Sequence, residues 1–478
     1  MKKVLVSLLI LLCFTACAPY IENYPLAKNA VNQERRVLAV KDKNRPTILV
    51  AISGGGSRAA ALGWTVLKEL RQFKYLYNGK SHALVDDVDV ISSVSGGSVI
   101  AAYYGLYGSE RLNEFKTAFL DPDNMDTLGM DAVNPLTWFK IAISGSSSIN
   151  EIEALFDRQL FHGRTFADLN RPGKPLVILN STDMAGGEIF TFTPDQFDDI
   201  CSDFDKQAIS VGVASSAAVP IVLTPVTLQD YSTTHCQGQP IPEWISQKFK
   251  HKLSPYLNIE EYKLARYAND LRHGPDIYRD IDYIHLLDGG LADNLGIHGL
   301  INSISSIHGQ GELLKHINNG DIKKLVVMVI NARSGNKNNP LDQSPDHPGL
   351  ADMVSSVVSV PIDSGSSTIN SLLDVLLGQI TEASQLAPSD AQFGQLKVYP
   401  VVIDFDQLRD GDPGQKILQA QAKAVPTLWS ISHENLDVIE NAGQLLLHQH
   451  PCFQRLLMDL AINAPFIEAD FAQAGCSP

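Results

Sequence analysis

Three short glycine-rich segments, each placed after an apolar run, constrain the fold of this chain most strongly. They read Gly54-Gly55-Gly56-Ser57-Arg58, Ser93-Val94-Ser95-Gly96-Gly97-Ser98 and Asp288-Gly289-Gly290. Each apolar run is typical of a buried strand, and the first two segments lead into helical patterns. Strand-to-helix corners of this kind are where α/β proteins keep reactive groups. The alternation of strand and helix patterns predicts an α/β fold with a largely parallel sheet.

The first segment is predicted to form an anion-binding helix N-terminus. It follows the apolar run 47–52 and precedes apolar residues spaced as the buried stripe of a helix. Backbone amides at such a position point outward and attract an anion or a developing oxyanion. A nucleotide phosphate loop would need a lysine before its Ser or Thr, whereas this chain has Ser57-Arg58. A simple tight turn would need fewer glycines.

The second segment places Ser95 at a corner between the predicted strand 88–94 and a buried helical run, 99–104. A nucleophile elbow usually reads Gly-x-Ser-x-Gly, because small neighbours allow a sharp turn. Ser93 stands at the position of the first glycine. Taken alone, the segment is more often an ordinary flexible turn.

The third segment begins with Asp288, which ends the predicted strand 284–287. Asp-Gly is also the commonest kind of turn sequence. A desolvated carboxylate at the end of a neighbouring strand can nevertheless take a proton from a serine directly. The three segments together indicate a serine nucleophile, an oxyanion site and a carboxylate base.

In their order and residues, these segments resemble the patatin-like phospholipases. The resemblance also covers Pro175–Asp183 and Ala214–Pro220, spans most of residues 46–335 and continues more weakly to about residue 450. It implies a three-layer α/β/α fold and a Ser-Asp dyad rather than a triad. The implied roles are Ser95 as nucleophile, Asp288 as base and the Gly54, Gly55 and Gly56 loop as oxyanion hole, with the amides of Gly55 and Gly56 as donors.

The implied reaction is a two-step acyl transfer on an acyl-ester lipid, such as a membrane phospholipid, without a cofactor. Arg58 would either contact a substrate phosphate or pin the glycine loop. His285 alternates away from Asp288 on its strand, and packing or solvation is expected of it. Two other functions remain open. One is an envelope scaffold without turnover, for which Ser93 in the elbow is the sequence support, and the other is acyl transfer to another lipid.

The N-terminus predicts export and lipid anchoring. Lys2-Lys3 precede the apolar run 4–14, which is too short to span a bilayer and fits a signal peptide. The run ends in Phe14-Thr15-Ala16-Cys17, which resembles the bacterial lipobox, in which the cysteine is acylated. An ordinary cleaved signal peptide is the alternative. Since Ala18-Pro19 lack an aspartate retention signal, the resemblance implies the periplasmic side of the outer membrane, with the membrane as partner through the anchor.

Cysteine usage agrees with export. Without Cys13 and Cys17, four cysteines remain, at positions 201, 236, 452 and 476. Four cysteines allow three different sets of disulfide pairs. Proximity favours the pairs 201 with 236 and 452 with 476. None has zinc-ligand spacing, so no structural metal is predicted. The net charge of −15 makes nucleic acid a poor partner.

Breaks in the pattern divide the chain. The predicted parts are a signal peptide (1–16), a tether (17–45), the catalytic core (46–335), with insertions near 105–174 and 227–283, and a final part (336–478) that holds a surface loop, a strand and helices. Insertions at such locations can line or cover a substrate cleft. A late strand is expected over 397–405 and a C-terminal helix over 436–447.

Overall fold

The computed structural model describes residues 21–28, 30–32, 42–128, 148–169, 171, 173–220, 223–237, 239–242, 245, 255–275, 277–304, 316–317, 319–335, 371, 373–375, 377–378, 380–381, 396–409, 411–462 and 476. The strands are β1 (Thr47–Ile52), β2 (Lys74–Tyr77), β3 (Lys80–Ala83), β4 (Val88–Val94), β5 (Leu176–Asp183), β6 (Ile189–Phe192), β7 (Val226–Gln229), β8 (Tyr283–Asp288), β9 (Lys324–Asn331) and β10 (Lys397–Asp404). The helices are α2 (Gly56–Gln72), α3 (Gly96–Tyr107), α4 (Leu112–Phe115), α5 (Asn124–Thr127), α7 (Ser148–Phe156), α8 (Phe166–Leu169), α9 (Pro194–Asp199), α10 (Ile209–Ser216), α11 (Ser232–His235), α13 (Pro255–Leu271), α14 (Gly290–Asp293), α15 (Ile297–Ile304), α19 (Pro413–Ala424), α20 (His433–Gln449) and α21 (Pro451–Asp459).

A mixed, mostly parallel sheet organises the molecule. Its strand order is β10-β9-β1-β4-β5-β8-β7, and β6 pairs with β5. The strands from β10 to β5 run parallel, whereas β8 is antiparallel to both β5 and β7. Because β1 and β4 are neighbours and parallel, the glycine loop and the Ser95 corner emerge at the same edge of the sheet. The antiparallel pairing of Ser181 with Asp288 brings the start of the third glycine segment to the end of β5.

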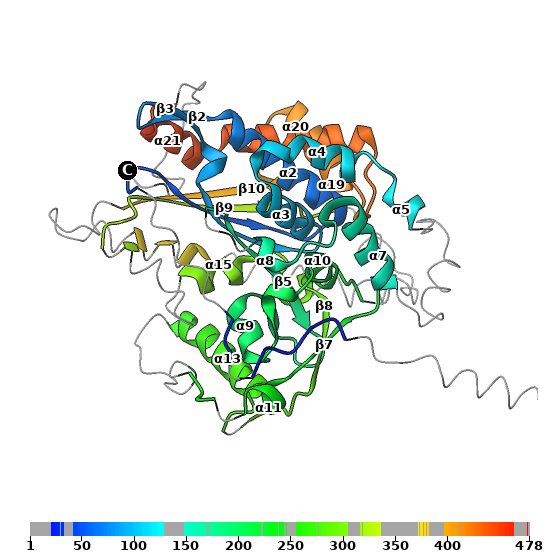
Figure 1. Ribbon diagram of the computed structural model, residues 1–478. Helices are drawn as coiled ribbons and strands as arrows, with labels where there is room; N and C mark the ends of the chain where they lie inside the picture. Colours follow the sequence, from blue (N-terminus) through cyan, green and yellow to red (C-terminus); the bar gives the residue numbers. More distant parts are fainter. Residues whose placement is uncertain are drawn as a thin grey trace, which may run out of the picture.

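Helices cover both faces of the sheet. Alternate β1 residues contribute to two separate apolar cores, with Ile48, Val50 and Ile52 in one and Leu49 and Ala51 in the other. Figure 1 shows α2, α3, α19 and α20 on one face and α15 on the other. A strand covered on both faces is apolar throughout, which explains the continuous run 47–52. The predicted three-layer α/β/α fold is therefore confirmed.

Residues 22–32, within the predicted tether, contact distant parts of the chain. The Asn23 side chain donates to Ser202 Oγ and to the Gln229 carbonyl, each at 3.0 Å, and accepts from the Gln229 amide at 2.8 Å. Pro25 forms a β-bridge with Ser202. The described residues of 22–32 therefore belong to the folded body, because their polar groups find partners far along the chain.

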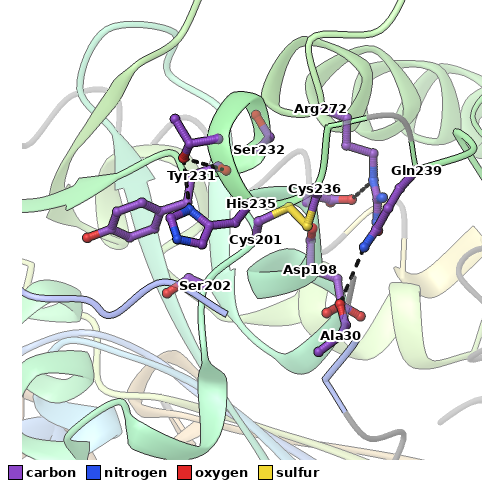
Figure 2. Close-up of a disulfide and its surroundings, with 12 residues drawn as sticks. Ala30, Asp198, Cys201, Ser202, Tyr231, Ser232, His235, Cys236, Gln239 and Arg272 are labelled. Atoms are coloured by element: carbon purple, nitrogen blue, oxygen red, sulfur yellow. Dashed lines mark hydrogen bonds and ion pairs between the residues drawn. A yellow bond between two sulfur atoms is a disulfide. The ribbon is translucent and has the colours of Figure 1, made fainter. Parts of the chain in front are cut away.

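Both favoured disulfides are present. Cys201 bonds to Cys236 and Cys452 bonds to Cys476, across 35 and 24 residues of sequence. Figure 2 shows the first one beside Ala30, whose carbonyl oxygen accepts a hydrogen bond from Gln239. Loops of these lengths correspond to about 3 to 4 kcal/mol of stabilisation per disulfide in the chain-entropy model.

The predicted C-terminal elements are present, whereas some predicted segments lie outside the described residues. The late strand is β10, and the C-terminal helix is α20. Residues 1–20, with Cys17, and most of the predicted surface loop lie outside the described residues. Within the described part of the chain, no helix is long and apolar enough to cross a membrane.

Candidate active site

The Ser95 corner has the backbone of a nucleophile elbow. Ser95 joins β4 to α3 at φ 51° and ψ −123°, a sparsely populated conformation for a residue with a side chain. A Cβ atom at Gly96 would overlap the carbonyl oxygen of Gly56, and one at Gly97 would lie 2.6 Å from the Ser53 carbonyl oxygen. Glycine is therefore required here because the elbow packs directly on the glycine loop.

Asp288 lies at the end of β8, beside the elbow. Its carboxyl group accepts a hydrogen bond from the Gly290 amide at 2.8 Å, and the Ser95 side chain lies close enough to affect its ionisation. Burial raises the pKa of Asp288 to about 6, and the Gly290 amide and the Ser95 side chain act in the opposite direction. Asp288 and Ser95 are each 5% exposed. The structure thus brings together the two side chains predicted as base and nucleophile.

The three glycines of the loop differ in the use of their amides. The Gly54 amide donates to the Asn294 carbonyl at 3.0 Å, and the Ser57 amide donates to the Leu428 carbonyl at 2.7 Å. The amides of Gly55 and Gly56 donate to no acceptor in the described part of the chain. Both have positive φ, at 140° and 58°. Within the loop, the amides of Gly55 and Gly56 are therefore the candidate donors, because the Gly54 N–H group already has an internal partner.

Arg58 lies beneath this loop. Its Nε donates to the Ala332 carbonyl at 2.8 Å, and its Nη1 donates to the Val425 carbonyl. The side chain is buried, and burial lowers its pKa to about 10. The sequence left two roles open for Arg58, a substrate contact and pinning of the glycine loop. These contacts favour pinning, because the guanidinium joins the start of α2 to the ends of β9 and α19.

A set of buried hydroxyl groups supports the elbow and was missed from the sequence. Ser216 Oγ, at the end of α10, accepts from the Ser95 amide at 2.9 Å and donates to the Asn180 carbonyl at 2.7 Å. Ser98 Oγ lies 2.9 Å from Ser216 Oγ and 3.2 Å from Ser93 Oγ. Ser93, which replaces the first glycine of the elbow, is thus fully buried, and its hydroxyl group has a polar partner. The similarity over 214–220 was the available signal.

Asn294 is a second residue missed from the sequence. Its backbone carbonyl accepts a hydrogen bond from the Gly54 amide, and its side-chain Oδ1 lies 2.5 Å and 2.9 Å from where a Cβ would stand at Gly54 and at Gly290. It therefore connects the glycine loop to the segment after Asp288. Its position just beyond the Asp-Gly-Gly motif was the available signal.

Neither a histidine nor a metal cluster joins the dyad in the described residues. His285 is exposed, and its Nδ1 lies 3.0 Å from Thr227 Oγ1. The described residues contain no group of three or more His, Cys, Asp and Glu side chains placed to hold a metal ion.

A comparison with known protein families gives one match. The family model for patatin-like phospholipase matches residues 50–301, more than half of the chain. No curated protein sequence matches.

Among solved structures, human GIVD cytosolic phospholipase A2 is similar at a TM-score of 0.40 and 11% identity, over 87% of this chain and 60% of that one. The same enzyme with a methyl γ-linolenyl fluorophosphonate inhibitor and terbium chloride gives 0.39 and 10%, over 87% and 59%. VipD from Legionella pneumophila gives 0.27 and 10%, over 95% and 78%. This chain thus spans about 60% of the length of the human enzyme. By the family match, the chain belongs to the patatin-like phospholipases.

Proposed function

We propose that the protein is a serine acyl hydrolase that cleaves ester bonds of acyl lipids, with Ser95 as nucleophile and Asp288 as base. Membership of the patatin-like phospholipase family supports lipid acyl hydrolysis as the general activity. The observation that carries the specific proposal is the placement of the Ser95 side chain beside a buried carboxyl group whose pKa is about 6. Such a carboxylate is ionised at neutral pH, yet basic enough to accept a proton.

The proposed mechanism has two steps. Ser95 Oγ attacks the ester carbonyl carbon while Asp288 takes the hydroxyl proton, and the oxyanion accepts hydrogen bonds from the Gly55 and Gly56 amides. Asp288 then gives its proton to the leaving alcohol, which leaves an acyl-enzyme. Water attacks the acyl-enzyme, Asp288 takes a proton from it, and that proton returns to Ser95 as the acid departs. Each oxyanion donor is worth about 3 to 4 kcal/mol of transition-state stabilisation.

The dyad is tested by Ser95→Ala and Asp288→Asn, each purified and assayed on a short-chain ester. We expect each variant to lose at least about 1,000-fold in kcat, because the nucleophile and its base act as a unit. A serine-directed fluorophosphonate should label Ser95 in the wild type. Ser93→Ala is the control and should lose far less activity. Near wild-type turnover by either folded variant would exclude the dyad.

The same assays distinguish the other functions considered from the sequence. A folded wild-type protein that neither turns over any ester nor reacts with the fluorophosphonate would be a scaffold. Acylated acceptor lipid in place of free fatty acid would identify an acyltransferase.

We further propose that Cys17 carries a lipid anchor that holds the mature protein at the periplasmic side of the outer membrane. The support is the sequence of residues 2–17 alone. Mass spectrometry of the mature N-terminus should find an acylated cysteine, and Cys17→Ala should release the protein from the membrane fraction. An unmodified N-terminus at another residue would indicate ordinary secretion.

A further inference from the structure

The glycine loop 54–56 needs support from outside itself. Glycine leaves the backbone free to adopt many conformations, so three glycines in a row do not hold their own amides in one direction. The amides of Gly55 and Gly56 must nevertheless stand in fixed positions if they are to stabilise an oxyanion without reorganising. Contacts with other segments of the chain therefore have to fix this loop.

One short segment between α19 and α20 supplies several of these contacts. We call this segment, Val425–Ser430, the C-terminal clasp. The Ser57 amide donates to the Leu428 carbonyl at 2.7 Å, and the Ser57 hydroxyl group donates to the Ser430 carbonyl at 2.9 Å. Arg58 Nη1 donates to the Val425 carbonyl. The two residues that follow Gly56 are thus bound to three carbonyl groups of a segment more than 360 positions further along the chain, since the two side-chain contacts span 373 and 367 positions.

The clasp also contacts Gly56 directly. A Cβ atom at Gly56 would stand 2.5 Å from the Leu428 carbonyl oxygen and 3.2 Å from the Leu428 backbone nitrogen. The Gly56 carbonyl oxygen in turn lies 1.9 Å from where a Cβ atom would stand at Gly96, in the Ser95 elbow. Gly56 is therefore held between the clasp and the elbow, and this packing fixes its backbone relative to the proposed nucleophile.

Helices α5 and α7 hold the clasp in turn. Asn124 Nδ2 donates to the Trp429 carbonyl at 2.9 Å, and the Met125 amide donates to Ser430 Oγ at 2.7 Å. The Trp429 ring meets the ring of Phe156 edge-on, with 5.3 Å between the centroids. The two helices that the clasp connects, α19 and α20, lie on the same face of the sheet as α2 (Figure 1). The clasp is thus fixed on several sides, as a support for a mobile backbone has to be.

We propose that the C-terminal clasp holds the glycine loop in its oxyanion-binding conformation and that Ser57 is a positioning residue of the site. This inference rests on the proposed function, because it concerns how the amides of Gly55 and Gly56 are placed for that reaction. Ser57 is fully buried, and its hydroxyl group donates to Ser430, so it acts through the loop rather than by contact with substrate. The clasp lies outside residues 50–301, the part of the chain that matches the family, so membership of the family does not assign it this role.

The test is Ser57→Ala, which removes one hydrogen bond to the clasp and leaves every glycine of the loop in place. We expect kcat for a short-chain ester to fall about 5- to 50-fold, less than the loss of about 100- to 1,000-fold for removal of a whole oxyanion donor. KM should change little, because Ser57 does not contact substrate. An unchanged kcat in the folded variant would overturn the proposal.

A thionoester substrate shows whether the loss arises at the oxyanion site. It carries sulfur in place of the carbonyl oxygen, and amides placed for an oxyanion fit the larger sulfur atom poorly. The wild type should therefore prefer an ester over the matching thionoester. Ser57→Ala should lower this ratio of kcat/KM values several-fold, because its amides are no longer held for oxygen. A lower kcat with an unchanged ratio would place the effect elsewhere in the site and overturn the proposal.

Ser432→Ala is the matched control just beyond the clasp. Ser432 Oγ caps α20 by accepting a hydrogen bond from the Asn435 amide at 3.2 Å. Loss of this cap should lower the Tm but leave kcat and the ester-to-thionoester ratio unchanged. Equal losses of activity in the two variants would assign the effect to general destabilisation and overturn the proposal. If the wild type hydrolysed no ester, the proposed function itself would fail, which is a different outcome from an unchanged ratio.

Discussion

A single buried carboxyl group determines at which pH the proposed chemistry can operate. Asp288 is removed from water, which disfavours its charged form, while the Gly290 amide and the Ser95 hydroxyl partly compensate. The result is a pKa of about 6, well above that of an exposed aspartate. A histidine is thus unnecessary for a base that acts near neutral pH.

This pKa predicts an acid limb in the activity profile. Because the base must be ionised, kcat/KM for a soluble ester should fall about tenfold per pH unit below pH 6 and stay level just above it. Rates measured between pH 4.5 and 8 test this expectation. A half-maximal rate near pH 4 would mean that the titrating group is an ordinary exposed carboxylate instead.

At the scale of elements, the site depends on how α10 meets the elbow. The last residue of α10, Ser216, accepts the Ser95 amide across 121 positions of sequence. Without this acceptor, a buried N–H group in a strained turn would have no partner. The neighbouring Ser215 instead has its Oγ 2.9 Å from Ser181 Oγ and makes no hydrogen bond to the Ser95 amide.

Ser216→Ala should therefore lower kcat by about 5- to 100-fold, since an unsatisfied buried donor costs about 1 to 3 kcal/mol. KM should change little, because Ser216 positions the nucleophile rather than contacting substrate. Steady-state kinetics on a soluble ester separate the two parameters. Ser215→Ala is the matched control on the same helix, and equal losses in both variants would indicate a general packing defect.

At the scale of the whole molecule, buried carboxylates near the first disulfide control stability as pH changes. Burial raises the pKa of Asp199 to about 7, although Arg272 opposes this, and that of Asp230 to about 8. Figure 2 shows Arg272 and Ser232, a residue whose amide donates to Asp230, beside this disulfide. Both values lie above those of the unfolded chain, so the folded state binds more protons at neutral pH.

The free energy of unfolding should consequently fall as pH rises from 6.5 to 8.5. Below pH 6.5, His450 changes the free energy of unfolding in the opposite direction, because burial lowers its pKa to about 4. Asp230→Asn should raise the Tm at pH 8 and have a smaller effect at pH 6.5. Thermal unfolding at both values measures this, and Asp437→Asn, at an exposed site on α20, should leave the pH dependence as it is. A parallel shift at both pH values would contradict the assignment.

Local sequence patterns predicted the elements and the candidate reactive groups. The strand over 47–52 was predicted with its observed bounds, because a strand covered on both faces must be apolar at every position. Ser95 and Asp288 could be singled out as candidates because glycine corners are needed wherever backbones approach closely. The short separations within each cysteine pair also favoured the observed disulfides.

Only the tertiary structure decided how those groups are used. Three contacts join segments that lie far apart along the chain. The Gly54 amide donates to the Asn294 carbonyl, Arg58 donates to backbone carbonyl oxygens, and Asn23 donates to Ser202. Local periodicity reports which residues are buried, but the partner of a buried polar group depends on which segments the fold brings together.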